Sequence, residues 1–158
     1  MNNLINQMQQ DAGATAPNNM GKIGAVANGC CNAPHRCYGG GRKQPVGTYV
    51  FEANQKLRET KNTSVSVINC RYIKPMDTKL IDELSNEHQH LITLEEGVAI
   101  GGFGSMVLDY VNSKDLSIKV HVRGIDDRFI EHGTRDELLA DTGLDVDSVY
   151  NIIANLID

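Results

Sequence analysis

Residues 64–111 decide the fold: SVSVINCRYIKPMDTKLIDELSNEHQHLITLEEGVAIGGFGSMVLDYV. The run SVSVIN at 64–69 alternates β-branched with small polar residues, which is typical of a strand. Asp77 stands at the N-cap position of an amphipathic helix predicted over 77–88. The run HLITLEE at 90–96 follows directly and is again typical of a strand. The stretch therefore predicts a repeated alternation of strands with helices.

The sequence on either side of this stretch continues the alternation. After the glycine-rich turn at 97–105, we expect a helix with an inward face of Phe103, Met106, Val107, Tyr110 and Val111. The same patterns predict a helix over 47–59, a strand over 116–124, a helix over 135–140 that Thr134 caps and Gly143 ends, and a last helix that begins at Asp145. Because single helices separate the strands, the prediction is an α/β fold, a mostly parallel sheet flanked by helices.

Length and composition indicate one ordinary domain. The chain has 158 residues, of which 41% are hydrophobic and 22% charged, close to the averages of globular proteins. No apolar run approaches the ~18 residues of a membrane-spanning helix, and the N-terminus lacks the pattern of a secretory signal. We therefore expect a cytoplasmic protein without a membrane partner.

Charge divides the chain into two regions. The net charge of −5 argues against a nucleic-acid partner, because phosphate binding needs clustered Lys and Arg. Residues 1–45 carry four basic and one acidic side chain, whereas residues 46–158 carry eleven basic and nineteen acidic ones. We expect 1–45 to be an irregular or poorly ordered segment, in which only Lys22–Asn28 resembles a strand, and 46–158 to be the α/β domain.

One cysteine cluster has potential metal ligands. The spacing C-C-x3-H-x-C places Cys30, Cys31, His35 and Cys37 within eight residues. Structural zinc usually takes ligand pairs from two separated segments, and no second C-x-x-C exists here. Reduced, free thiols are therefore the favoured interpretation.

The turn Gly101–Ser105 allows two interpretations. A glycine-rich turn at a helix N-terminus exposes backbone N–H groups that suit a phosphate. However, Val107 occupies the place of the third glycine of G-x-G-x-x-G, and no Gly-Lys-Ser/Thr follows. Close packing of the turn against the sheet is the favoured alternative.

Other candidate side chains follow the predicted strands. Glu95 and Glu96 end one strand, where active groups of open α/β sheets gather, but neighbouring strand residues face opposite ways. Arg71 follows the strand 64–69 on a short turn, where its guanidinium would grip a phosphate or carboxylate or else pair with an acidic neighbour. The histidines outside the cysteine cluster, which form no ligand signature, are His88, His90, His121 and His132.

Three separated segments carry a resemblance to a known family: INCRYIKPMD, LITLEEGVAIGGFGS and HVRGIDDRFIEHGTRDELLADTGLD. Over about residues 47–158 the chain resembles the C-terminal domain shared by transketolase, the β subunits of 2-oxo acid dehydrogenases and 1-deoxy-D-xylulose-5-phosphate synthase. The last segment is most similar to the deoxyxylulose phosphate synthase branch. The resemblance implies a transketolase-type fold for 46–158.

The resemblance also implies a reaction. Members of the synthase branch use thiamine diphosphate and Mg²⁺ to decarboxylate pyruvate and join the two-carbon unit to glyceraldehyde 3-phosphate, which supplies isoprenoid precursors. By position, Arg71 matches the family arginine thought to hold the substrate phosphate, and Gly101–Ser105 matches a packing segment that helps to assemble the dimer. The implied partners are a second copy or the preceding domains.

The cofactor machinery of that family lies in domains that the sequence does not match. No G-D-G followed by Asn-Asn is present, so we expect this chain to bind no cofactor or metal and to be inactive alone. Three alternatives to a partial synthase chain remain. The first is a stand-alone regulatory or dimerisation module, and the second is the C-terminal part of a split transketolase or 2-oxo acid dehydrogenase β chain. The third is a small nucleotide-binding protein that uses Gly101–Ser105.

The family's first apolar strand is replaced here by GCCNAPHRCYGGGRKQP at 29–45. One hypothesis is a shifted reading frame over 22–46, which resequencing of the coding DNA tests. Otherwise the sheet either loses a strand or builds it from Lys22–Asn28.

Overall fold

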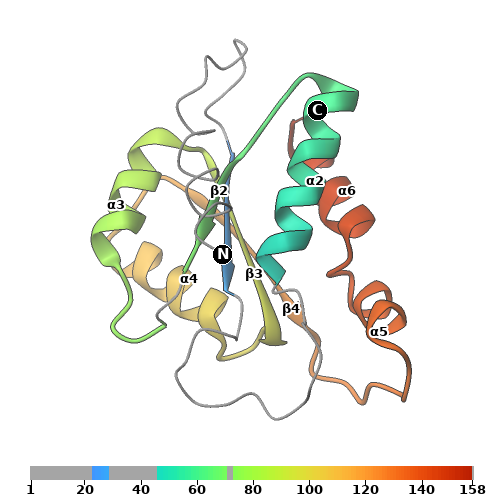
Figure 1. Ribbon diagram of the computed structural model, residues 1–158. Helices are drawn as coiled ribbons and strands as arrows, with labels where there is room; N and C mark the ends of the chain where they lie inside the picture. The colour runs from blue at the N-terminus through green and yellow to red at the C-terminus, as the bar shows by residue number, and fades with distance from the viewer. Residues whose placement is uncertain (1–22, 29–45, 71–72, 158) are drawn as a thin grey trace, which may run out of the picture.

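The computed structural model describes residues 23–28, 46–70 and 73–157. Strands and helices alternate from β1 to β4, and two further helices follow (Figure 1). The elements are β1 (Ile23–Asn28), α2 (Val46–Lys61), β2 (Ser66–Asn69), α3 (Thr78–Glu87), β3 (His90–Val98), α4 (Phe103–Ser113), β4 (Lys119–Ile125), α5 (Arg135–Thr142) and α6 (Val146–Ile157). All strand pairs are parallel, in the order β2-β1-β3-β4. The predicted α/β fold is therefore confirmed.

Strand β1 lies inside the sheet, between β2 and β3. Its register places Gly24 opposite Ser66 of β2 and Leu91 of β3. Of the two outcomes expected for this part of the chain, the structure shows the second, a strand built from Ile23–Asn28. The remainder of 1–45 lies outside the described residues, so its predicted irregularity and the division of the chain at residue 45 stay predictions.

Strand β3 separates two apolar clusters because its side chains alternate between the faces of the sheet. Ile92 and Leu94 pack under α2 and α6, whereas Leu91 packs under α3 and α4, and all three are fully buried. Figure 1 shows the two helix pairs on opposite sides of the sheet. The molecule is thus a three-layer α/β/α arrangement.

Capping residues fix the helix ends as predicted. Asp77 Oδ1 accepts a hydrogen bond from Leu80 N at 3.1 Å at the start of α3. Thr134 and Glu137 form a reciprocal capping box on α5, and Gly143 ends that helix at φ 69° in the left-handed region.

Two strands are shorter than predicted, for identifiable reasons. Both backbone groups of Val65 are hydrogen-bonded by the buried Asn54 side chain, at 2.8 and 3.2 Å, so β2 begins only at Ser66. Leu116 N still bonds to Val111 O of α4 at 3.1 Å, so β4 begins at Lys119 rather than at residue 116. On α4, Phe103 and Val107 are buried as expected, while Met106 and Tyr110 are only half-buried.

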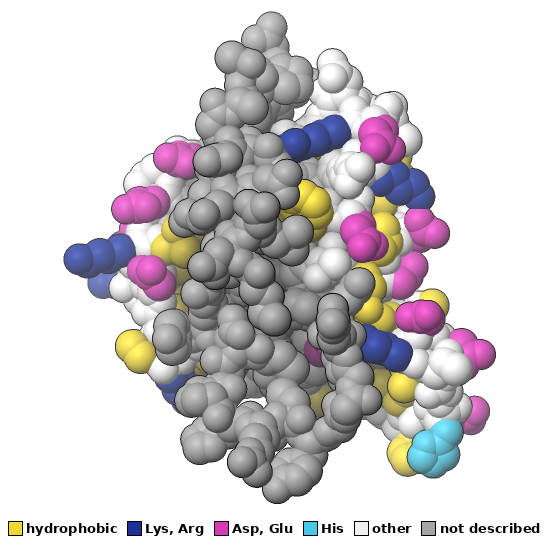
Figure 2. Space-filling model, in the orientation of Figure 1, with side chains coloured by type: hydrophobic (Ala, Val, Ile, Leu, Met, Phe, Trp, Pro, Cys, Tyr) yellow, Lys and Arg dark blue, Asp and Glu magenta, His cyan; other side chains and the backbone are white. Residues whose placement is uncertain are grey.

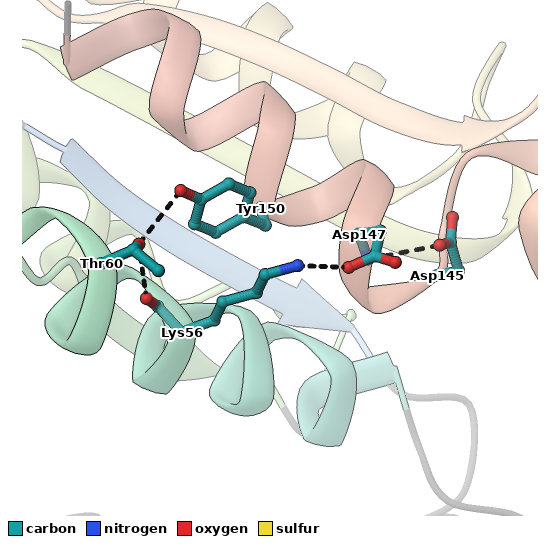
Figure 3. Close-up of polar contacts among 5 residues, drawn as sticks. All are labelled: Lys56, Thr60, Asp145, Asp147 and Tyr150. Carbon is teal, nitrogen blue, oxygen red and sulfur yellow. Dashed lines mark hydrogen bonds and ion pairs between the residues drawn. The ribbon is translucent and has the colours of Figure 1, made fainter.

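Polar contacts join α6 to α2 at the surface (Figure 3). Lys56 Nζ lies 2.6 Å from Asp147 Oδ1 and 4.8 Å from the centre of the Tyr150 ring. The Tyr150 hydroxyl lies 3.0 Å from Thr60 Oγ1, and Asp145 accepts a hydrogen bond from Asp147 N at 3.2 Å. The hydrogen bond to Asp147 is the largest cause of a raised pKa of Lys56. These contacts link the exposed sides of α2 and α6 above the apolar cluster that the two helices share.

Among the described residues, no helix combines the length and the hydrophobicity that crossing a membrane would require.

Candidate functional site

The carboxyl ends of the parallel strands meet at one edge of the sheet, where open α/β proteins place their binding groups. Glu95, Glu96 and the turn at 97–102 stand there at the end of β3, beside Ile125 of β4. Arg71 follows β2 and lies outside the described residues, so its predicted phosphate contact stays a prediction.

Glu95 is buried and points toward α4. Its side chain is 6% exposed, its Oε2 accepts from Phe103 N at 2.9 Å, and its Oε1 accepts from Gly104 N at 3.0 Å. A carboxylate at this position satisfies two N–H groups that the first helical turn leaves unpaired and complements the helix dipole. Glu95 therefore caps α4 from the neighbouring strand.

The glycines of the turn allow this close approach. A Cβ on Gly102 would lie 2.5 Å from Glu95 Oε2, and one on Gly104 would collide with Thr93 and Val122. Gly101 has φ 74°, which a residue with a side chain rarely adopts. These contacts support the packing interpretation of Gly101–Ser105.

An external phosphate does not fit the N-terminus of α4. The N–H groups that would bind it are taken by the chain's own Glu95 carboxylate, whose negative charge also repels an anion. The described residues at this turn therefore do not suit a nucleotide or the diphosphate of thiamine diphosphate.

Glu96 points to the opposite face of the sheet, toward α5. Its Oε1 lies 2.7 Å from Arg135 Nη2, and Arg135 Nε donates to the Tyr49 hydroxyl at 3.4 Å. The hydrogen bond to Glu96 is the largest cause of the raised pKa of Arg135. Sequence reasoning did not single out Arg135, because no local pattern links residues that stand 39 positions apart.

A cavity of about 580 Å³ adjoins this ion pair. Its lining consists of Glu96, Ile125, Ile130, Glu131, His132, Gly133, Arg135, Leu138, Leu139, Thr142 and Leu144. The volume is typical of small-molecule pockets, and the lining is mostly apolar with a few polar groups. The cavity brings His132 near Glu96 and Arg135, which the sequence did not predict.

The other histidines serve the scaffold. His88 is buried at the C-cap of α3, with its Nε2 2.9 Å from Ser66 Oγ. His90 Nδ1 lies 3.0 Å from His121 Nε2, and burial followed by the charge of His90 lowers the pKa of His121. In residues 23–28, 46–70 and 73–157, no three potential metal-ligand side chains gather.

The cysteine cluster Cys30, Cys31, His35 and Cys37 lies outside the described residues. Cys70 is a free cysteine, and burial raises the pKa of its thiol to about 11. A thiol that stays protonated at neutral pH is a poor nucleophile or metal ligand. Cys70 is therefore no candidate for nucleophilic catalysis.

The matched family is the one described as "Transketolase, C-terminal domain", over residues 46–149. The chain belongs to this family. The match starts at the first residue of α2 and ends inside α6, so it includes β2, β3 and β4 with their helices. It confirms the family assignment that the three sequence segments carried.

Curated relatives share the same region. The 1-deoxy-D-xylulose-5-phosphate synthase of Clostridium perfringens (strain SM101 / Type A) is 37% identical over 105 residues, 66% of this chain and 17% of that protein. The enzyme of the same name from Carboxydothermus hydrogenoformans is 41% identical over 102 residues, 65% of this chain and 16% of that protein. The chain thus spans about a sixth of the length of these relatives.

One solved structure has a fold similar to that of this chain. It is described as "Split gene transketolase, inactive beta4 tetramer" and is 26% identical, with a TM-score of 0.69. The likeness covers 87% of this chain and 40% of that chain. The family and the fold therefore agree across sequence and structure.

Proposed function

We propose that this chain is the C-terminal domain, or a partial chain, of a thiamine-diphosphate-dependent 1-deoxy-D-xylulose-5-phosphate synthase. The reaction decarboxylates pyruvate and joins the remaining two-carbon unit to glyceraldehyde 3-phosphate, which releases CO2 and forms deoxyxylulose phosphate, a precursor of isoprenoids. The observation that carries the proposal is the identity of 37–41% to synthases of that name over 105 and 102 residues of the family domain. The cytoplasm is its proposed location.

The proposed contribution of the domain is dimer contact and substrate-phosphate binding through Arg71, without cofactor binding. Glu95 supports the last point, because its carboxylate accepts from the backbone N–H groups at the start of α4 to which an anion could otherwise bind. The tetramer named for the split-gene relative supports self-association of such chains. By this proposal the chain alone is inactive, because the family's cofactor loops belong to other domains.

A chimera tests the proposal. Residues 23–158 of this chain replace the C-terminal domain of the Clostridium perfringens synthase, and deoxyxylulose phosphate formation is measured. We expect an active chimera, an inactive synthase that lacks the domain, and no activity from this chain alone. Turnover of pyruvate by the purified chain alone would contradict the proposal.

Arg71 is tested in the same chimera. Removing a charge-assisted contact to phosphate should raise the KM for glyceraldehyde 3-phosphate about tenfold or more in Arg71→Met, with little change for unphosphorylated glyceraldehyde. Arg58→Met, on the exposed side of α2, is the matched control and should leave both values unchanged. An equal loss for both aldehydes would argue that Arg71 has only a structural role.

The split-gene transketolase favours one alternative, in which this chain is the C-terminal part of a split transketolase or 2-oxo acid dehydrogenase β chain. Under this alternative the chain copurifies with a separate chain that binds thiamine diphosphate. A stand-alone regulatory module would instead bind a ligand by itself. Calorimetric titration with ADP, NAD and thiamine diphosphate distinguishes these, since the main proposal expects no heat from any of the three.

A further inference from the structure

The cavity beside α5, which we call the α5 cavity, has one carboxylate oxygen without a donor. Glu96 Oε1 accepts from Arg135 Nη2 at 2.7 Å, and Arg135 Nε donates to the Tyr49 hydroxyl at 3.4 Å. The hydroxyl of Thr142, another lining residue, donates to Leu138 O at 2.8 Å. Glu96 Oε2, by contrast, receives no hydrogen bond from the residues that the structure describes, and the Glu96 side chain is 24% exposed. A ligand in the cavity therefore meets an oxygen that can still accept.

Most of the wall of the α5 cavity is apolar. The apolar lining residues are Ile125, Ile130, Leu138, Leu139 and Leu144. An apolar ligand body against these side chains leaves water, which favours binding, while the few polar groups fix its orientation. The cavity thus fits a molecule with an apolar body and one polar end.

Hydrogen bonds hold two sides of the α5 cavity in place. Ile125 O accepts from Ala99 N at 3.0 Å, which joins the end of β4 to the turn after β3. At the start of α5, Thr134 and Glu137 form the capping box that fixes the helix next to Gly133. Because these walls are already ordered, binding of a ligand costs little conformational entropy of the chain.

The charges of the lining determine which polar end fits. Glu96 and Glu131 are acidic and Arg135 is basic, so the lining carries one net negative charge when His132 is neutral. A protonated amine would gain an ionic hydrogen bond at Glu96 Oε2. A carboxylate or phosphate would instead be repelled by the acidic groups, and it would compete with Glu96 for Arg135.

The surroundings of the cavity carry the same sign of charge. Residues 125–142 include six acidic and two basic side chains. One of the two basic ones, Arg128, is already paired with Asp141 at 2.6 Å. Figure 2 shows acidic side chains in magenta gathered at the right, over the region where Figure 1 draws α5. This negative field attracts cations toward the cavity and keeps anions away from it.

We propose that the α5 cavity binds an organic cation, an amine whose apolar body is similar in size to an indole ring. Its ammonium group donates to Glu96 Oε2, and its apolar body packs on the isoleucine and leucine side chains of the wall. The site goes beyond the proposed synthase role, because the substrates of that reaction carry carboxylate or phosphate groups. A neutral analogue of the amine keeps the apolar contacts and loses the ionic hydrogen bond.

Tryptamine is the probe, because the chain contains no tryptophan and indole fluorescence then comes from the ligand alone. The fluorescence anisotropy of tryptamine is followed as the full chain is added. Tryptophol and indole-3-propionate carry the same ring with a hydroxyl or a carboxylate. We expect tryptamine to bind at least about fivefold more tightly than tryptophol and about tenfold more tightly than indole-3-propionate. Equal affinities for the three, or no rise in the anisotropy of tryptamine, overturn the inference.

Glu96→Gln tests the acceptor. This change removes the negative charge and keeps the shape of the side chain, so tryptamine should bind about tenfold more weakly. Tryptophol should bind as before, which also verifies that the cavity persists. Indole-3-propionate should bind at least about threefold more tightly, since the lining loses its net negative charge.

Asp127→Asn is the matched control for Glu96→Gln. It removes the same charge from an exposed loop residue that does not line the cavity, so the Kd of tryptamine should change less than about twofold. Equal losses in the two variants would mean that the general charge of the loop attracts the amine, and they would overturn the role of Glu96 and the site with it.

The location of the site is tested without any substitution. Amide ¹⁵N–¹H NMR spectra of the full chain are recorded during titration with tryptamine. We expect the largest shifts at lining residues, among them His132, Gly133 and Thr142. Shifts confined to residues outside the lining overturn the inference.

The outcomes separate this site from the synthase assignment. An active chimera together with a chain that does not bind tryptamine overturns the α5 site alone. An inactive chimera together with the expected preference for the amine overturns the synthase assignment alone.

Discussion

Glu95 is a buried carboxylate whose two oxygens are both hydrogen-bonded to backbone N–H groups of α4. Without such bonds, burying a charge would be costly. With them, one residue links β3 to α4 and positions the turn at the carboxyl edge of the sheet. Its partner in sequence, Glu96, links the same strand to α5 through Arg135.

Removal of the Glu95 carboxylate should therefore cost stability. Glu95→Ala leaves two buried N–H groups unpaired and a hole beside the turn, so we expect the free energy of unfolding to fall by about 3 kcal/mol. Urea denaturation measures this change. Glu83→Ala, an exposed carboxylate of α3, is the control and should stay near the wild type. Equal midpoints for both variants would refute the capping role.

A methyl group on Gly104 should be poorly tolerated. Its Cβ would collide with Thr93 of β3 and Val122 of β4, on which α4 packs. Gly104→Ala should therefore lower the free energy of unfolding by about 1–3 kcal/mol through overpacking. At Gly97 the nearest atom to an added Cβ, Glu95 Oε2, lies 3.5 Å away, an ordinary contact. Gly97→Ala is therefore the matched control. In thermal melting, the melting temperature of Gly104→Ala should fall well below that of Gly97→Ala.

The His90–His121 pair predicts a pH dependence. The pKa of His121 is lowered by burial first and then by the charges of His90, Arg123 and Lys119. The unfolded chain therefore binds more protons than the folded one as the pH falls below the ordinary value of 6.5, and stability is lost through that window. Urea midpoints at pH 7.5 and 5.5 measure the loss.

His121→Gln should flatten this decline, because it removes the group whose pKa differs between the two states. A His132→Gln variant, in which an exposed loop histidine changes, should keep the full decline. If all three proteins lose the same stability between the two pH values, the pair does not cause the dependence.

At the scale of elements, α6 is held mainly by apolar burial. Ile153 and Val149 are 0 and 1% exposed in the cluster that α6 shares with α2 and β3. The Lys56–Asp147 pair is exposed, and surface ion pairs contribute little because water and salt screen them.

Two variants distinguish these contributions. Ile153→Ala should lower the free energy of unfolding by about 2–5 kcal/mol through lost burial and a residual cavity. Lys56→Ala should change the urea midpoint only slightly, and the change should shrink further in high salt. A larger effect of Lys56→Ala than of Ile153→Ala would contradict this account of α6.

At the scale of the whole molecule, β1 lies between β2 and β3 and pairs with both. A chain that begins at Val46 keeps the whole family match but leaves β2 without a neighbour in the described sheet. We expect this truncation to abolish cooperative unfolding, measured by circular dichroism during heating. A chain that begins at Gly21 keeps β1 and should melt cooperatively.

Most elements could be predicted because their signals are local. Asp77, Thr134 and Gly143 end or begin helices through contacts within a few residues, and period-2 and period-3.6 patterns reveal the strands and helices. The first residues of β2 and β4 could not be predicted, because residues of preceding helices bond to the chain just before each strand. Asn54 of α2 bonds to Val65, and Val111 of α4 bonds to Leu116. Arg71 and the cysteine cluster lie outside the described residues and remain predictions.

The sequence by itself determined the α/β class, the capped helix ends, the family and the opposite directions of Glu95 and Glu96, since each follows from short-range geometry or matched segments. Only the tertiary structure decided that Glu95 caps α4, that Arg135 meets Glu96, and that β1 lies inside the sheet. It also decided that His132, Glu96 and Arg135 line one cavity. These contacts depend on which helices and strands become neighbours in the fold. The neighbours are determined by the burial of both faces of the sheet by helices, and no single segment of the sequence encodes that arrangement.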